Sequence, residues 1–586
     1  MITREEIRIA IEEGNYEKAA GLLKEYVSDP AKYSDTIAIY DAAIGEYYGD
    51  RQRMWEAIRS GLLANGRNYE LYVMLGNYYL QENMQKSWLC YENALFYCDE
   101  PEDQKLIRGL MDQLENEYDI VVNRASAVIL SDNLLEYTKL CIDSIRMTTP
   151  EGAREIIVVD NASEDGSVEW LRLQPDIILL ENREKIKFSA GCNQGITAAS
   201  GPSDIFLLHN DTILTENTLF WLRMGLYDKE GNGAVSCVSN CAVYGMEAGS
   251  NICTIPGLLD FGRQTNLPEK QFYENRIFLD SIALLIRREA LNRAGLMDER
   301  FSFSPHMGMD YGLRLLKSGY KNLICKNSFI ICFGKQLPGG NSKENEAFLK
   351  RGKEEFKAKW GDEFSYYSHI RKDLLYLIEE EKEKPLHILE IGCGCGASLE
   401  YAGGGYLNAK LYGVELNPKA AQIAAYVGEV ICADVENLDF PWEEEYFDYV
   451  LMGDVLEHLL DPEAVLKRLR KHVKTGGRII ISMPNVKHYS VLLPLLLEDR
   501  FSYEDAGILD RTHVRMYTGT EIQMLVSRSG YQFETLQYVQ LAEELPETER
   551  RIIDGLAELM ETPAKASYLA YQYIGKAVKT PETENV

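Results

Sequence analysis

Basic charge, long apolar runs and paired cysteines are all scarce in this sequence. Its 62 Lys and Arg residues face 91 Asp and Glu residues, and the formal net charge of −29 disfavours a nucleic-acid partner, because phosphate backbones would be repelled. The N-terminal MITREEIRIAIEEG lacks the apolar region of a secretory signal. The longest apolar run, LLPLLL at 492–497, is too short to span a bilayer. We therefore expect a cytoplasmic protein with no membrane span.

The 12 cysteines are scattered and form no CxxC pair. Cys393 and Cys395 lie inside a glycine-rich loop, where a zinc cage would distort the turn. The pattern therefore predicts reduced thiols that act as small hydrophobic side chains.

The chain is long enough for several domains. Its 586 residues, 46% of them hydrophobic, suggest at least three domains at about 100–200 residues each. Periodicity and composition predict a multidomain fold of five parts: an all-α region at 1–118, an α/β domain at 122–360, a charged helical linker at 361–384, a second α/β domain at 385–578 and a disordered tail at 579–586.

The first region contains a loose internal repeat. Ile44-Gly45 and Tyr48 recur as Leu75-Gly76 and Tyr79, and small residues follow each set. Small residues let paired helices approach closely, while Tyr and Leu fill the layer between them. This pattern resembles tetratricopeptide repeats, which implies a protein partner at these helices. A plain helical bundle is the alternative.

A glycine loop opens the second α/β domain. The strand-like LHILEIG runs into GCGCG, with glycines at 392, 394 and 396, and a helix-like stretch follows. Glycine suits a strand-to-helix turn that presses its backbone against a ligand. Glu415 ends the next strand, where a carboxylate accepts ribose hydroxyls, and Asp434 ends the third.

Residues 370–578 resemble class I S-adenosylmethionine-dependent methyltransferases, with a Rossmann-like fold. FDYVLMGDVLEHLLDP, GGRIIISMPN and DRTHVRMYT also match that family. An NAD-binding domain is the alternative, but it requires the GxGxxG spacing. The resemblance implies that S-adenosylmethionine is bound by Glu390, Gly392, Gly394, Gly396, Glu415 and Asp434. For a hydroxyl acceptor the candidate bases are His458, which follows the fourth strand, His488 and His513.

Three segments of the middle domain form an ordered series: EIIVVDNASEDGSVEWL, KFSAGCNQGI and DIFLLHNDT. Together they resemble family 2 glycosyltransferases of the A-type (GT-A) fold, over about 125–360. The resemblance implies a nucleotide-sugar donor held by Asp160, Asn161, Asn193 and Asp211. Asp211 would also bind a divalent cation, Mn²⁺ or Mg²⁺, that stabilises the departing diphosphate. An ordinary loop acid is the alternative for Asp211.

One position of the middle domain departs from that family. Arg287, Gly295, Asp298, Asp310 and Arg314 fall where the family has them, but Met307 and Gly308 replace an acidic pair whose second member is the usual general base. We rank Asp310 first and His306 second as the catalytic replacement.

The sequence thus predicts a bifunctional transferase. One activity moves a glycosyl group from a nucleotide sugar to a glycan or protein acceptor, and the other moves a methyl group from S-adenosylmethionine. The rival hypothesis is a methyltransferase with a catalytically degenerate glycosyltransferase-like domain that serves as a binding scaffold.

Overall fold

The protein is described by a computed structural model that covers residues 2–241, 246–249, 251–269, 273–301, 304–334, 343–364, 366–541, 545–559 and 565–581. The chain divides into two compact units, Met1–Glu363 and Phe364–Val586. In the part of the chain that is described, no helix combines the length and the apolar character needed to cross a membrane.

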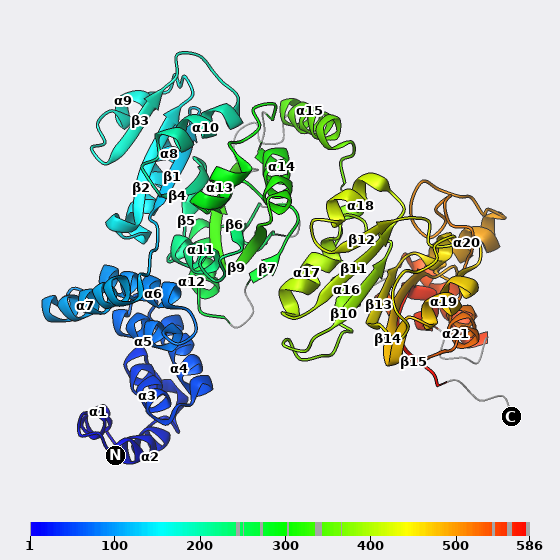
Figure 1. The fold of residues 1–586 in the computed structure, drawn as a ribbon, viewed down its shortest axis with the longest axis horizontal. Coiled ribbons are helices and arrows are strands. Elements are labelled where there is room, and N and C mark those ends of the chain that lie inside the picture. The colour runs from blue at the N-terminus through cyan, green and yellow to red at the C-terminus, as the bar shows by residue number, and fades with distance from the viewer. Residues whose placement is uncertain are drawn as a thin grey trace. The chain divides into compact units, whose positions relative to one another are not determined.

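The first unit begins with seven consecutive helices, drawn in blue in Figure 1. They are α1 (Arg4–Glu12), α2 (Tyr16–Tyr26), α3 (Asp35–Tyr48), α4 (Arg51–Ala64), α5 (Tyr69–Tyr79), α6 (Met84–Tyr97) and α7 (Pro101–Tyr118). The predicted all-α region is confirmed by this run of helices, which ends at Tyr118.

Glycines let these helices pack in pairs. A Cβ on Gly45 of α3 would lie 2.9 Å from the backbone nitrogen of Met54 in α4, and one on Gly76 of α5 would lie 2.3 Å from the ring of Tyr91 in α6. Both glycines belong to the internal repeat. Their packing explains why the repeat places a small residue there, and the assignment to tetratricopeptide repeats stays a prediction.

A mixed nine-stranded sheet follows in the same unit. Its order is β3-β2-β1-β4-β8-β6-β9-β5, and β7 pairs with β9. The strands are β1 (Ala125–Ser131), β2 (Arg154–Asp160), β3 (Ile177–Glu181), β4 (Asp204–His209), β5 (Thr212–Leu214), β6 (Asn232–Ser239), β7 (Tyr273–Asn275), β8 (Ala283–Ile286) and β9 (Lys321–Cys332). The α/β domain predicted for this stretch is thereby confirmed.

Helices cover this sheet on both faces (Figure 1). They are α8 (Leu135–Thr148), α9 (Ser167–Leu171), α10 (Phe188–Ala198), α11 (Thr218–Leu226), α12 (Ile255–Thr265), α13 (Arg288–Ala294), α14 (Ser304–Lys317) and α15 (Lys343–Trp360). α10 approaches β1 closely because Gly195 stands at the contact, where a Cβ would lie 2.3 Å from the side chain of Val128.

The helical region and the sheet domain share one hydrophobic core. The cluster runs from Leu75 and Tyr91 in the helices to Phe220 and Trp221 in α11. Buried polar contacts join the same surfaces, because Lys86 forms an ion pair of 2.7 Å with Asp228. We conclude that the helices are built onto the sheet domain, which explains why both lie in one compact unit.

The second unit is a seven-stranded sheet in the order β12-β11-β10-β13-β14-β16-β15. The strands are β10 (His387–Ile391), β11 (Lys410–Glu415), β12 (Glu429–Cys432), β13 (Phe447–Gly453), β14 (Val473–Pro484), β15 (Tyr531–Leu541) and β16 (Ala570–Lys579). The first five are parallel and β15 and β16 are antiparallel. This arrangement confirms the predicted Rossmann-like domain.

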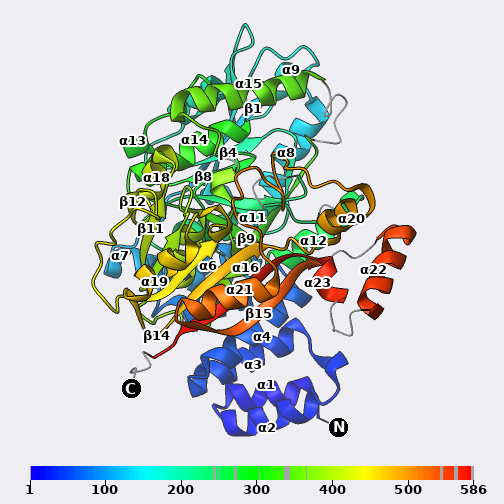
Figure 2. The same ribbon diagram turned by 90° about the vertical axis from the view of Figure 1, so that its right-hand side faces the viewer.

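The helices of the second unit are α16 (Lys372–Leu375), α17 (Ala397–Gly405), α18 (Pro418–Ala424), α19 (Pro462–Arg470), α20 (Tyr489–Glu498), α21 (Gly519–Arg528), α22 (Glu547–Leu559) and α23 (Lys565–Leu569). Figure 2 shows α21 and β15 in orange, and in the sheet β16 lies between β14 and β15. The predicted linker at 361–384 contains α16, and Leu374 and Leu375 are buried in the core of this unit. Of the predicted tail, β16 ends at Lys579 and 582–586 lie outside the described residues.

Candidate functional sites

Three neighbouring strands of the first sheet end together at its carboxyl edge. In the parallel register Ser131 at the end of β1 stands beside Asp160 at the end of β2, while Leu130 stands beside His209 at the end of β4. Ligands of open α/β sheets bind at this edge, where the strands meet the loops that follow them.

At this edge one carboxylate oxygen of Asp160 makes no hydrogen bond among the described residues, whereas the side chain of Asn161 both donates and accepts hydrogen bonds. Asp160 is 1% exposed; one carboxylate oxygen accepts from the amide of Ser163 at 3.0 Å, and the other has no hydrogen-bond partner among the described residues. The side-chain amide of Asn161 donates to the carbonyl of Ile186, and its oxygen accepts from the amide of Ile186 at 2.8 Å. Asn161 therefore positions the loop before α10, and Asp160 retains the capacity to bind a ligand.

Asn193 is likewise a positioning residue in this structure. Its amide nitrogen donates to the carbonyl of Met297 and to the carboxylate of Glu299, and its oxygen accepts from the amide of Met297 at 2.9 Å. It fixes the loop between α13 and α14 against α10, and its predicted contact with a nucleotide sugar stays a prediction.

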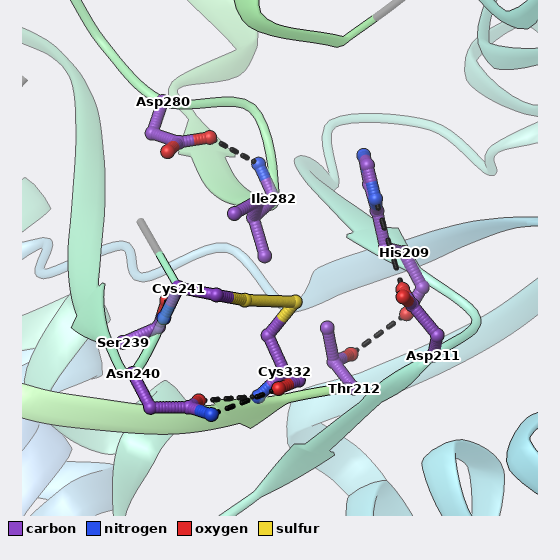
Figure 3. Close-up of a disulfide and its surroundings, with 9 residues drawn as sticks. All are labelled: His209, Asp211, Thr212, Ser239, Asn240, Cys241, Asp280, Ile282 and Cys332. Atoms are coloured by element: carbon purple, nitrogen blue, oxygen red, sulfur yellow. Dashed lines mark hydrogen bonds and ion pairs between the residues drawn. A yellow bond between two sulfur atoms is a disulfide. The ribbon is translucent and has the colours of Figure 1, made fainter. Parts of the chain in front are cut away.

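Asp211 lies between β4 and β5 with a mostly free carboxylate (Figure 3). It is 8% exposed, and among the described residues its carboxylate pairs with His209, 3.8 Å from Nδ1 to Oδ1. The backbone oxygen of Asp211 accepts from the amide of Phe333, which anchors the turn to the end of β9. A carboxylate fixed by its backbone and open at its oxygens fits a divalent cation.

Sequence reasoning missed His209 and Asp280, which Figure 3 draws in the same neighbourhood. His209 packs its ring against Phe188, with 5.0 Å between centroids, and its buried Nε2 has no hydrogen-bond partner in the described part of the chain. Asp280 is 2% exposed and caps the amide of Ile282, just before β8. His209 stands within DIFLLHNDT, one of the three segments of the ordered series, so a signal for it was present in the sequence.

The expectation of reduced cysteines is wrong for one pair. A disulfide joins Cys241 to Cys332, with 6.1 Å between their Cα atoms (Figure 3). Parallel pairing of β6 with β9 brings these distant positions together, and the side chain of Asn240 makes two hydrogen bonds to the backbone of Cys332. Spacing along the sequence gives no sign of a pairing that depends on the order of strands.

The carboxylate of Asp310 has three partners. It is 1% exposed and accepts from Trp360 Nε1 at 2.9 Å and Arg314 Nε at 3.1 Å, while Lys359 Nζ lies 2.5 Å away. These contacts join α14 to α15 and occupy the carboxylate, which therefore links the two helices.

The positions that carry acids in the family pattern leave no room for them here. Met307 is 1% exposed, and a Cβ on Gly308 would lie 2.4 Å from the carbonyl oxygen of Leu279. α14 therefore packs too closely against the segment before β8 to admit a carboxylate at 308 without a backbone shift.

His306 is half-buried near the start of α14. Its Nδ1 is buried and has no hydrogen-bond partner among the described residues, and burial lowers the pKa of its imidazole. The lowered pKa favours the neutral ring that a general base requires. Nδ1 itself lies against α15, where a Cβ on Gly352 would come within 2.6 Å of it.

The glycine loop of the second unit adopts a backbone that favours glycine. Gly392, Gly394 and Gly396 have φ values of 71°, 54° and 80°. A Cβ on Gly394 would lie 2.4 Å from the carbonyl oxygen of Tyr367. This turn follows β10 and leads into α17, so its backbone amides lie at the carboxyl edge of the sheet.

Carboxylates surround this loop. Glu415 is 6% exposed and accepts from the amides of Gly394 and Asn417, each at 2.8 Å. Glu390 is buried, one of its oxygens has no hydrogen-bond partner among the described residues, and burial raises its pKa to about 8. Asp434 is exposed and lies just after the end of β12. Its carboxylate accepts hydrogen bonds from the backbone amide of Glu436 and the side-chain amide of Asn437. These residues fit a cofactor with a ribose. Glu415 accepts two hydrogen bonds from backbone amides, and a carboxylate can accept further hydrogen bonds, such as those from ribose hydroxyls.

His458 and His513 lie together beyond the end of β13, with 4.8 Å between their ring centroids. Burial, followed by the neighbouring His513, lowers the pKa of His458. Sequence reasoning missed Glu457 beside them, whose carboxyl pKa is raised well above its ordinary value by burial. His488 is buried at the start of α20, where Nδ1 lies 2.8 Å from Ser490 Oγ, and burial lowers its pKa to about 4.

Comparison with known proteins gives two separate matches. Residues 126–293 match the model of glycosyl transferase family 2, and residues 360–536 match the model of a methyltransferase domain. Among curated proteins, the chain is 34% identical over 112 residues to the chloroplastic tocopherol O-methyltransferase of Arabidopsis thaliana, covering 18% of this chain and 31% of that protein. It is 28% identical over 205 residues to the mitochondrial ubiquinone biosynthesis O-methyltransferase of Homo sapiens, covering 30% of this chain and 54% of that protein.

A solved structure described as a SAM dependent methyltransferase from Archaeoglobus fulgidus shows 18% identity, covers 38% of this chain and 98% of its own, and has a TM-score of 0.27. The chain thus spans about a third to a half of the length of the two curated relatives named above. The first matched segment includes β1 to β8, and the second includes β10 to β14 and the start of β15. The chain therefore contains a family 2 glycosyltransferase domain and a methyltransferase domain.

Proposed function

We propose that this chain is a bifunctional transferase that moves a glycosyl group from a nucleotide sugar and a methyl group from S-adenosylmethionine. The observation that carries the proposal is that each sheet ends, at its carboxyl edge, in a buried carboxylate with one oxygen that has no hydrogen-bond partner among the described residues: Asp160 in the first unit and Glu390 in the second. Asp211, which follows β4, is 8% exposed and lies 3.8 Å from His209. Buried acids without partners are costly unless a ligand uses them.

In the glycosyltransferase domain, Asp160 is proposed to accept from the nucleoside and Asp211 to hold a divalent cation. That cation supplies charge stabilisation to the departing diphosphate. Asn161 and Asn193 act indirectly by fixing the two loops that border the site. The acceptor is a glycan or a protein, and the helices α1–α7 are proposed to present it.

His306 is proposed as the base that deprotonates the acceptor. Burial lowers its pKa, whereas the carboxylate of Asp310 is held by Lys359, Arg314 and Trp360. This reverses the order inferred from sequence alone, in which Asp310 came first. Nucleotide-sugar binding without turnover by any acceptor would instead support the scaffold hypothesis.

In the methyltransferase domain, the amides of the glycine loop and Glu415 are proposed to hold the cofactor. The cofactor supplies an electrophilic methyl group, and the protein aligns the acceptor in line with it. The two curated relatives are named as O-methyltransferases, and we propose a hydroxyl acceptor here as well. His458 and His513 face the space beyond β13, where this acceptor would approach.

Calorimetric titration tests the cofactor assignment. Wild type should bind S-adenosylmethionine, and Glu415→Ala should weaken binding by about 1–3 kcal/mol, which is the cost of lost hydrogen bonds to a charged acceptor. Glu443→Ala, at an exposed position of the same unit, should leave the affinity unchanged. Equal affinity in wild type and Glu415→Ala would remove Glu415 from the site.

A second titration tests the glycosyltransferase site with a panel of nucleotide sugars, with and without Mn²⁺. Binding should depend on Mn²⁺ in wild type and be lost in Asp211→Asn, while Asp143→Asn, at an exposed acid of α8, should behave as wild type. Donor hydrolysis should fall in His306→Ala. Metal-independent binding by Asp211→Asn would overturn the assignment of Asp211.

A further inference from the structure

A compact group of metal-binding side chains follows β13 in the second unit. One ligand atom each from Glu457, His458 and His513 lies within 4.8 Å of the others. Glu457 and His458 come from the turn directly after β13, and His513 comes from the loop between α20 and α21. The three residues are therefore adjacent in space although His513 is distant in sequence.

The carboxyl group of Glu457 is buried without a partner. Its side chain is 0% exposed, and neither oxygen makes a hydrogen bond among the residues that the structure describes. Native proteins satisfy nearly all buried polar atoms, so two orphaned oxygens on one buried side chain indicate a missing ligand.

Backbone hydrogen bonds set the tautomer of both imidazoles. Nδ1 of His458 lies 3.2 Å from the carbonyl oxygen of Thr512, and Nδ1 of His513 lies 2.9 Å from the carbonyl oxygen of Ile508. A carbonyl only accepts, so each Nδ1 carries the proton and each Nε2 keeps its lone pair. Metal-binding histidines are held in this way, with the second ring nitrogen donating to a carbonyl.

The backbone holds the three residues together. The carbonyl oxygen of Glu457 accepts from the amides of Val514 and Arg515, at 3.0 and 3.1 Å. These bonds attach the segment that carries His513 to the turn that carries the other two residues. The arrangement is thus built by main-chain contacts and does not depend on the side chains that face one another.

We propose that Glu457, His458 and His513 form a binding site for one divalent transition-metal ion of the Zn²⁺ class. The carboxylate and the two Nε2 atoms supply three ligands, and the fourth position stays open, as in catalytic zinc sites. Two imidazoles with one carboxylate favour Zn²⁺ over Mg²⁺, which prefers oxygen ligands. Bond lengths near 2.0–2.2 Å draw the side chains slightly inward from their present spacing.

The site lies beside the cofactor loop. A Cβ on Gly392 would meet the side chain of Val455 at 2.9 Å, and Val455 stands two positions before Glu457. His458 is only half-buried, so the site is not fully enclosed by the protein.

The catalytic consequence rests on the proposed methyl transfer. An acceptor hydroxyl that enters the open position releases its proton to solvent water, because metal binding lowers the pKa of a bound hydroxyl. Its oxygen forms the new bond to the methyl carbon as the sulfur–methyl bond breaks, and the electron pair of that bond returns to sulfur. His458 acts in this step as a ligand and not as the free base.

Direct metal titration tests the site without an acceptor. The full-length protein is stripped with a chelator and titrated with Zn²⁺ in competition with a chromophoric chelator. Wild type should bind one more Zn²⁺ than Glu457→Gln or His513→Gln, or bind it at least tenfold more tightly. Co²⁺-loaded wild type should show visible absorption of a low-symmetry site, which His513→Gln should lack.

A matched control is His472→Gln, since His472 is half-buried like His458 and its Nδ1 also faces a carbonyl, that of Glu443 at 3.1 Å. It should bind Zn²⁺ as wild type does. S-adenosylmethionine titration of each variant reports whether the fold is intact, and failure of wild type in that assay would refute the proposed methyl transfer while leaving the metal result standing. Equal Zn²⁺ binding by wild type, Glu457→Gln and His513→Gln, or displacement of Zn²⁺ by equimolar Mg²⁺, would overturn the proposal.

Discussion

Lys359 Nζ lies 2.5 Å from Oδ1 of Asp310, and this ion pair joins the end of α15 to the middle of α14. Asp310 is 1% exposed, and its carboxylate also accepts hydrogen bonds from Arg314 and Trp360. A residue that the sequence suggests as a catalytic base is thereby a structural anchor in the fold.

We predict that Asp310→Asn lowers the free energy of unfolding of the first unit by about 1–3 kcal/mol, because it removes a buried charged acceptor that bonds Arg314 and Trp360. Lys359 keeps its second ion pair, with Asp298 at 2.6 Å, and this limits the loss. Asp260→Asn, which removes an exposed ion pair with Arg263, should change stability by less than about 1 kcal/mol. Urea denaturation followed by tryptophan fluorescence measures both. A stable Asp310→Asn variant that loses only sugar transfer would return Asp310 to the catalytic role.

The shared core predicts that the helices stabilise the sheet domain. Arg223 of α11 is 3% exposed and pairs with Glu92 of α6. Glu92→Ala should lower the free energy of unfolding by about 3–5 kcal/mol, because an uncompensated charge stays buried. Glu102→Ala, at an exposed position of α7, is the control. Equal stability of the two variants would show that the interface between helices and sheet carries little energy.

Gly394→Ala should abolish S-adenosylmethionine binding. The new Cβ would lie 2.4 Å from a backbone oxygen, and the residue would have to keep a φ of 54°. Gly405→Ala, at the end of α17, meets no atom within 4 Å and should bind normally. Calorimetry measures affinity, and circular dichroism establishes that both variants are folded. Wild-type affinity in Gly394→Ala would show that the loop does not contact the ligand.

Glu390 predicts a pH dependence of stability. Burial raises its folded-state pKa to about 8, so the folded chain keeps a proton that the unfolded chain releases at lower pH. Its contribution to stability is complete below the ordinary glutamate range and is lost as pH rises to about 8. Glu390→Gln removes this loss, so its melting temperature should fall less than that of wild type between pH 5 and 8. Parallel curves of melting temperature against pH for wild type and Glu390→Gln would contradict the raised pKa of Glu390.

The local pattern of the chain determines its elements and their class. The seven helices, the strands that end in Asp160 and Glu415, the glycine turn and the final antiparallel pair all follow from periodicity, turn residues and apolar runs within short windows. Contiguous motifs also identify the family of each domain, because each motif forms the end of one strand and the turn after it.

Tertiary structure alone decided which of these polar residues are free to act. Asn161 and Asn193 belong to sequence motifs, yet their side-chain amides form hydrogen bonds to the backbone of loops that come near them only after folding. The disulfide between Cys241 and Cys332 and the grouping of His513 with Glu457 and His458 depend on strand order and loop path. The spacing of residues along a chain determines what one segment forms, whereas hydrogen-bond partners and burial depend on segments that are distant in sequence and meet only in the fold.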